Sequence, residues 1–125
     1  MEAFPHKELS YEIIGASMEV HRTLKPGLDE KLYERALIIE LNKRGLHAAQ
    51  QKQFPVNYKG TAIGTLIPDL IVDDKIIVDA KVVSEFCSAH ISQMLGYLNI
   101  TDLEVALLIN FKNASLEHQR VFKKL

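Results

Sequence analysis

The sequence predicts an α/β domain of three layers, with helices on both faces of a mixed β-sheet. Two stretches with helical spacing of apolar residues come first, and runs rich in Val and Ile follow them. A third helical stretch and two more strands complete the chain. The order helix, helix, three strands, helix, two strands fits a sheet covered by helices. With 125 residues, the chain is long enough for one modest core, so residues 1–125 are expected to form a single domain.

Composition indicates an ordinary soluble protein, with 47% hydrophobic and 25% charged residues. The formal net charge of -1 gives no global basic field, so any surface for nucleic acid must be local. Cys87 is the single cysteine and cannot form an internal disulfide, which fits a reducing cytoplasm. No leader and no membrane-spanning run is recognisable, so we expect a cytoplasmic protein without a membrane partner.

The first helix is predicted from Glu8 to Leu24, where Pro26 and Gly27 follow and end it. His21 lies near its C-terminus, where a partly exposed histidine would be stabilised by the helix dipole. The stripe expected to be buried is Leu9, Ile13, Ala16, Val20 and Leu24.

The second helix is predicted to begin at Leu28 or Asp29 and to end at Arg44, with Asp29 as its N-cap. Glu30 and Glu34 are four residues apart and share a face, although acidic residues in a first turn are usually solvated. The expected stripe is Leu32, Ala36, Ile39 and the stem of Lys43, widened by Leu37 and Leu41.

Three successive strands, forming a meander, are predicted at residues 47–59, 61–72 and 75–83. Phe54, Val56 and Tyr58 alternate in the first, and Gly60 marks the turn after it. Pro68 breaks the second strand, which either aims Asp69 at a site or is only a bend.

The stretch from Leu66 to Val83 reads as a hairpin with Asp73-Asp74-Lys75 as its loop. This loop places Val72 opposite Ile76 and, further along, Asp69 opposite Asp79. Lys81 lies two residues from Asp79 and therefore on the same face. A loop of two residues would instead put the two aspartates on opposite faces.

Two carboxylates opposed among Ile and Val repel each other strongly and need a compensating cation. Lys81 supplies one positive charge. A divalent metal supplies two, and hard oxygen ligands suit Mg²⁺ or Mn²⁺.

A third helix is predicted from a Ser84 cap to about Asn99, with His90, Gln93 and Tyr97 along one face. Such a stripe is usually a helix surface or a packing edge. Residues 103–111 read as a central strand buried on both faces, and residues 116–122 as a final strand.

Three motifs resemble those of one nuclease superfamily. Pro68-Asp69 followed by Asp79-Ala80-Lys81 resembles the PD-(D/E)XK signature. Residues 27–34 match G-x-x-E-x-x-Y-E, the pattern of the GxxExxY protein family within that superfamily, although Lys25 departs from the usual Gly before it. Gln93 and Tyr97 are similar to the Q-x-x-x-Y helix motif of RecB-like members. The resemblance spans residues 8–122.

The resemblance implies a restriction-endonuclease-like fold with an αβββαβ core. It assigns Mg²⁺ or Mn²⁺ to Asp69 and Asp79, with the Ala80 carbonyl and Glu30 as further ligands. Lys81 would orient or deprotonate the attacking water, Gln93 would hold the water or the substrate, and Tyr97 would brace Gln93. Supporting positions are His21, His90 and Glu34.

The function that follows is metal-dependent hydrolysis of phosphodiester bonds, in DNA ahead of RNA. One alternative is an inactive or weakly active binding module that keeps the fold, which the small size and near-neutral charge favour. The other is a purely structural domain whose aspartates point apart. A homodimer or a partner subunit would supply further surface for nucleic acid.

Overall fold

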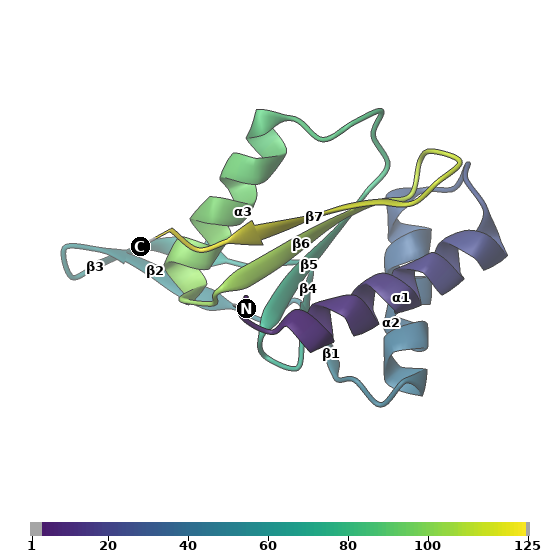
Figure 1. Ribbon diagram of the computed structural model, residues 1–125. Coiled ribbons are helices and arrows are strands. Elements are labelled where there is room, and N and C mark those ends of the chain that lie inside the picture. Colours follow the sequence, from purple (N-terminus) through teal and green to yellow (C-terminus); the bar gives the residue numbers. More distant parts are fainter. Residues whose placement is uncertain (1–3, 125) are drawn as a thin grey trace.

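The computed structural model describes residues 4–124, which contain three helices and seven strands (Figure 1). In chain order these are α1 (Lys7–Leu24), α2 (Glu30–Lys43), β1 (Ala48–Gln50), β2 (Phe54–Tyr58), β3 (Thr61–Leu66), β4 (Leu70–Val72), β5 (Ile76–Lys81), α3 (Ser88–Thr101), β6 (Val105–Asn110) and β7 (Glu117–Phe122).

The predicted three-layer α/β/α arrangement with a mixed sheet is confirmed. Five strands form the main sheet in the order β1-β4-β5-β6-β7, in which β5 and β6 run parallel and the other pairs antiparallel. Helices α1 and α2 cover one face and α3 covers the other (Figure 1). Strand β6 is buried along its whole length, as its apolar sequence predicts. Among the helices of residues 4–124, none combines the length and the hydrophobicity that crossing a bilayer requires.

The loop between β4 and β5 has the three residues predicted for it. Val72 pairs with Ile76, Ile71 with Ile77 and Leu70 with Val78. Asp73 and Asp74 have φ values of 52° and 56°, a left-handed conformation that Asp tolerates better than most residues. The Asp73 carboxylate also accepts a hydrogen bond from the His47 N–H at 2.8 Å, which ties the loop to the start of β1. The two-residue loop is therefore excluded.

The buried face of α2 differs from the predicted stripe. Leu32 and Ile39 are 44% and 59% exposed, whereas Tyr33, Leu37 and Leu41 are fully buried. The ring of Tyr33 stacks on Phe111 with centroids 4.6 Å apart. This aromatic contact rotates the helix so that every fourth residue from 33 faces the sheet.

The predicted meander is wrong. Residues 47–59 form two strands in different sheets, because β1 pairs with β4 while β2 pairs only with β3. The chain leaves β3 at Leu66 and enters β4 at Leu70, so the break at Pro68 separates two strands. Helix α3 begins at Ser88, four residues after the predicted cap. The His90 side chain accepts a hydrogen bond from the Cys87 N–H there, so Cys87 rather than Ser84 precedes the first turn.

Replacing Tyr33 by Phe tests how the loop before α2 is held. The Tyr33 hydroxyl donates to the Lys25 carbonyl at 2.5 Å and accepts from the Leu28 N–H at 3.2 Å. We expect Tyr33→Phe to lower the free energy of unfolding by about 1 kcal/mol, because both partners lose a hydrogen bond. Urea denaturation measures this. Tyr11→Phe, at a half-exposed tyrosine, is the control and should change it little; equal effects would contradict the assignment.

Candidate functional site

The candidate site lies where β5 ends, beside the start of α2 and the start of β4. Asp79 and Lys81 belong to β5 and share the face of Ile77, which packs in the core on the α3 side. Asp69 directly precedes β4, and the register of the hairpin carries it toward Asp79. Glu30 is the first residue of α2. The fold thus brings together polar residues from three elements.

Asp79 and Lys81 form the central ion pair, with 3.0 Å between Lys81 Nζ and Asp79 Oδ2. Their side chains are only 10% and 16% exposed. Burial raises the pKa of Asp79, with further contributions from Asp69 and Glu34, and Lys81 only partly offsets this. Burial lowers the pKa of Lys81, but the hydrogen bond to Asp79 and the charges of Asp79, Glu30 and Asp69 outweigh it, so the pKa is raised. Lys81 is therefore a cation at neutral pH.

Glu30 shares the same electrostatic environment. Although Glu30 is exposed, partial desolvation raises its pKa, and the negative charges of Asp79 and Asp69 raise it further, while Lys81 lowers it. Glu30 therefore lies within electrostatic reach of both aspartates and of the lysine. Glu34, four residues further along α2, is 5% exposed, and its negative charge raises the pKa of Asp79.

Gln93 and Tyr97 of α3 complete the cluster from the other helix layer. Gln93 Nε2 donates to the Tyr97 hydroxyl at 3.3 Å. Burial and the charges of Asp79 and Asp69 raise the pKa of Tyr97, so its hydroxyl stays protonated next to the carboxylates. We refer to Glu30, Asp69, Asp79, Lys81, Gln93 and Tyr97 as the acidic cluster.

The two histidines bond to backbone groups outside the acidic cluster. His21 is buried, not partly exposed as predicted, and its Nε2 lies 2.8 Å from the Asn113 carbonyl. This contact joins the end of α1 to the β6–β7 loop. His90 holds the first turn of α3, as described above. A supporting role for either histidine in the chemistry stays a prediction.

Two supporting residues were missed from the sequence. Gln50 of β1 donates to the Glu34 carboxylate at 3.4 Å, a contact between distant segments. Asn110 is fully buried, donates to the Val83 carbonyl at 2.7 Å and accepts from the Val83 N–H at 3.1 Å. It therefore fixes the chain just beyond Lys81. An Asn at the end of an apolar strand was the available signal for this role.

The oxygen atoms of the acidic cluster suit a hard divalent cation. Asp69, Asp79 and Glu30 supply carboxylates whose repulsion Lys81 only partly neutralises. The Ala80 side chain packs on the α1–α2 side, so only its backbone carbonyl could serve as a ligand. Within residues 4–124, no three His, Cys, Asp or Glu side chains already converge closely enough to hold an ion. The oxygen donors are chemically suited to such an ion. In this structure Lys81 pairs with the Asp79 carboxylate.

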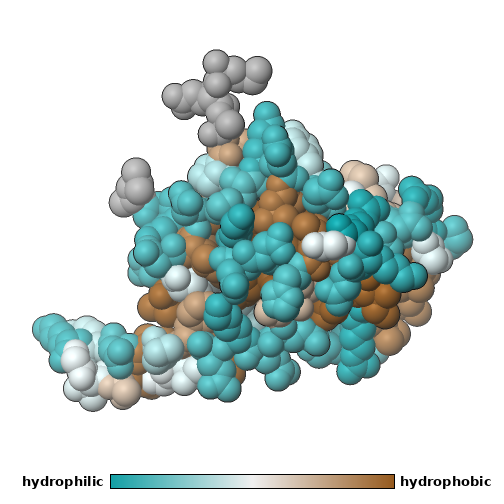
Figure 2. Space-filling view, turned by 90° about the horizontal axis from the view of Figure 1, so that it is seen from below, coloured by the Kyte–Doolittle hydropathy of each residue, from teal (hydrophilic) through white to brown (hydrophobic). Residues whose placement is uncertain are grey.

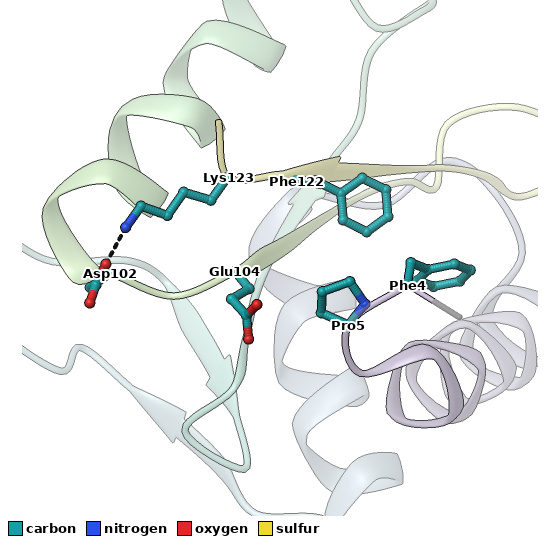
Figure 3. Close-up of a pocket in the computed structure, with 6 residues that line it drawn as sticks. All are labelled: Phe4, Pro5, Asp102, Glu104, Phe122 and Lys123. Atoms are coloured by element: carbon teal, nitrogen blue, oxygen red, sulfur yellow. Dashed lines mark hydrogen bonds and ion pairs between the residues drawn. The ribbon is translucent and has the colours of Figure 1, made fainter. Parts of the chain in front are cut away.

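A cavity of about 680 Å³ lies elsewhere, between the N-terminal segment and the end of β7 (Figure 3). Phe4, Pro5 and Phe122 form its apolar walls, and Lys123 is ion-paired with Asp102 at its side. None of its lining residues belongs to the acidic cluster, so this cavity is not the candidate site.

Comparison with known proteins points to one superfamily. A family model described as the PD-(D/E)XK nuclease superfamily matches residues 7–121. A search of curated proteins by sequence finds no match.

Solved structures share the fold at low sequence identity. The protein SSO0001 superposes with a TM-score of 0.61 and 13% identity, over 96% of this chain and 60% of that one. An alkaline exonuclease from Laribacter hongkongensis gives 0.55 and 11%, over 99% and 73%. A phage-related exonuclease from Haemophilus somnus gives 0.51 and 13%, over 99% and 79%. This chain thus spans about three fifths of SSO0001, and the likeness establishes the fold alone.

Replacing Glu30 by Gln tests the crowding of negative charge. Because the pKa of Glu30 is raised above 4.5 on folding, its ionised form is disfavoured in the folded protein. Glu30→Gln should therefore raise the melting temperature at pH 7 in chelator. The gain should fade as the pH falls through the folded-state pKa and be absent well below 4.5.

Thermal melts between pH 3 and pH 8 measure this, with Glu85→Gln, at an exposed loop glutamate, as the control. A lower melting temperature of Glu30→Gln at pH 7, or a gain in melting temperature that persists at the lowest pH, would refute the crowding of negative charge around Glu30.

Proposed function

The chain belongs to the PD-(D/E)XK nuclease superfamily, and on this premise we propose that it is a metal-dependent nuclease that cleaves phosphodiester bonds, with DNA as the preferred substrate. The observation that carries the proposal is the buried Asp79–Lys81 pair beside Asp69 and Glu30. Nucleases of this superfamily generally use divalent metals.

We assign Mg²⁺ or Mn²⁺ to the carboxylates of Asp69 and Asp79, with the Ala80 carbonyl and Glu30 as further donors. A bound divalent cation supplies charge that stabilises a phosphate and makes nearby water more acidic. Lys81, whose pKa the hydrogen bond to Asp79 raises, neutralises a phosphate oxygen and orients or deprotonates the attacking water.

Gln93 and Tyr97 position the substrate from α3. The Gln93 side chain is exposed and points its amide to the Tyr97 hydroxyl, so its carbonyl oxygen is free to accept a hydrogen bond from water. The raised pKa of Tyr97 keeps its hydroxyl protonated and able to donate. Together they fix the orientation of the Gln93 amide.

The GxxExxY assignment within the superfamily is also part of the proposal. The motif specifies the side chains at positions 30, 33 and 34. Each of them makes a particular contact in the structure, which supports the assignment. Glu30 belongs to the acidic cluster, Tyr33 stacks on Phe111, and Glu34 is buried beside Gln50. The motif residues therefore both orient α2 on the sheet, through Tyr33, and contribute Glu30 to the acidic cluster. Cytoplasmic location and a homodimer or partner subunit stay predictions.

The second candidate is a binding module that keeps the fold but does not cleave. The observation that favours it is that Lys81 already pairs with the Asp79 carboxylate. If that pair persists in solution at millimolar metal, the ion finds no site.

A nuclease panel tests the proposed activity. Purified wild type should cleave DNA with Mg²⁺ or Mn²⁺ and should lose cleavage in chelator. Asp79→Ala should lower the rate by at least about 100-fold, since it removes a metal ligand. Lys81→Ala should also impair cleavage but leave the carboxylates in place. Cleavage by Asp79→Ala at the wild-type rate would reject the assignment, because the activity would then not depend on Asp79 and could come from a contaminating nuclease.

Calorimetric titration distinguishes the enzyme from the binding module. Wild type should bind Mn²⁺ or Mg²⁺, and Asp69→Asn should weaken that binding at least about tenfold, because one anionic ligand is lost. Asp102→Asn, at an exposed aspartate that caps the C-terminal end of α3, is the matched control. No heat of binding at millimolar metal would favour the module.

A further inference from the structure

Strands β2 and β3 form a two-stranded ribbon that projects from the body of the protein (Figures 1 and 2). We call residues 54–66 the arm. Its base is anchored, because Phe54 packs against the core on the α3 side and Lys52 pairs with Asp74 at 2.8 Å. Most of β3 is exposed. An isolated two-stranded ribbon is marginally stable in water, so the chain maintains this projection with little stability of its own.

The charge of the arm differs from that of the rest of the chain. The chain has no Asp or Glu between Leu41 and Pro68, and within the arm itself Lys59 is the single charged residue. The exposed side chains of the arm are donors that proteins commonly use on phosphates, namely Asn57, Tyr58, Lys59, Thr61 and Thr65. This surface is therefore complementary to a polyanion.

Lysine at the tip of the arm occupies an unfavourable backbone position. Lys59 and Gly60 form a two-residue turn with φ values of 48° and 82°, the conformation for which Asn-Gly is preferred. The Lys59 ammonium lies 5.4 Å from the centroid of the exposed Tyr58 ring. A long cationic side chain at this position weakens the turn slightly and places a positive charge at the tip of the arm.

A β-bulge shapes the outer part of the arm. Val56 pairs with Gly64 and Asn57 with Ala62, so Ile63 is left without a partner. Bulges increase strand twist and turn side chains to new directions. Ile63 and Tyr58 are 65% and 61% exposed, so the arm also offers apolar and aromatic surface for sugars and bases.

The arm is continuous with the candidate site. Strand β3 ends at Leu66, three residues before Asp69. Residues 61–69 can span at most about 30 Å, which corresponds to about nine nucleotide steps along a duplex strand. A substrate strand that passes the acidic cluster therefore has phosphates within reach of the arm.

We propose that the arm binds the phosphate backbone of a nucleic acid on one side of the cleavage site, with Lys59 as its main phosphate contact and Tyr58 beside it. This inference rests on the proposed nuclease function. Lys59 supplies a positively charged contact for phosphate away from the acidic cluster, which a chain of near-neutral net charge needs to hold nucleic acid.

Binding of a fluorescein-labelled DNA of about 20 nucleotides, a length that covers the reach of the arm, tests the proposal. All proteins carry Asp79→Asn so that the DNA stays intact, and fluorescence anisotropy is recorded over a range of salt concentrations with Mg²⁺ present. Lys59→Asn removes the charge and suits the left-handed turn, so the arm keeps its fold. Affinity should fall several-fold, and the slope of log K against log salt should shrink by about 0.9 for duplex or 0.7 for single strands.

Arg22→Gln, at an exposed arginine in the last turn of α1 and on the other face of the sheet, is the charge control and should leave the slope unchanged. Equal slopes for the Asp79→Asn parent and the Lys59→Asn protein, with wild type still cleaving DNA, would overturn the arm proposal alone. Failure of wild type both to bind and to cleave would overturn it together with the proposed function. A change of oligomeric state in Lys59→Asn or Ile63→Asp, seen by light scattering, would show that the arm contacts a second copy instead, and would also overturn it.

Discussion

The register of the β4–β5 hairpin is the constraint on which the candidate site depends. Side chains alternate along a strand, so a slip of one residue would send Asp79 and Lys81 into the core beneath α1 and α2. The three-residue loop prevents this slip, because Asp73 and Asp74 accept left-handed backbone conformations. The Asp73 carboxylate also bonds to the His47 N–H and so links the loop to β1, outside the hairpin. One local turn therefore determines both the packing of β5 and the position of its charged side chains.

The acidic cluster is held together against its own electrostatics. Desolvation and mutual repulsion raise the pKa values of Asp79 and Glu30, which means that the folded protein disfavours their ionised forms at neutral pH. Lys81 offsets part of this cost. The burial of apolar side chains in the two cores on either side of the sheet offsets the rest of this cost and holds β5 between β4 and β6. Sites that oppose the stability of the fold in this way are typical of functional positions.

Features set by local chemistry could be predicted from the sequence, and those set by distant contacts could not. The hairpin register follows from three consecutive residues, and the ends of α1 and the burial of β6 follow from short patterns. The rotation of α2 depends on Phe111, far away in the chain, which periodicity does not include. Likewise, the separation of β1 from β2 depends on which strand each one meets. Within the site, the roles that the motifs predict for its residues stay predictions, and the contacts of Gln50 and Asn110 needed the fold.

The arm and the acidic cluster differ in how firmly the fold holds them. The proposed affinity for nucleic acid and the proposed cleavage therefore depend on separate parts of the structure. Asp79 and Lys81 lie on a strand between two others, and Glu30 and Tyr97 lie on helices packed against the sheet, so their mutual positions can hardly change without loss of the core. The arm is joined to the body by residues 51–53 and 67–69, and Phe54 at its base is the arm residue that packs against a core. Substitutions at its tip therefore leave the geometry around Asp79 intact while they alter what the outer surface binds. A small domain built in this way can change its substrate preference through the arm at little cost to its stability.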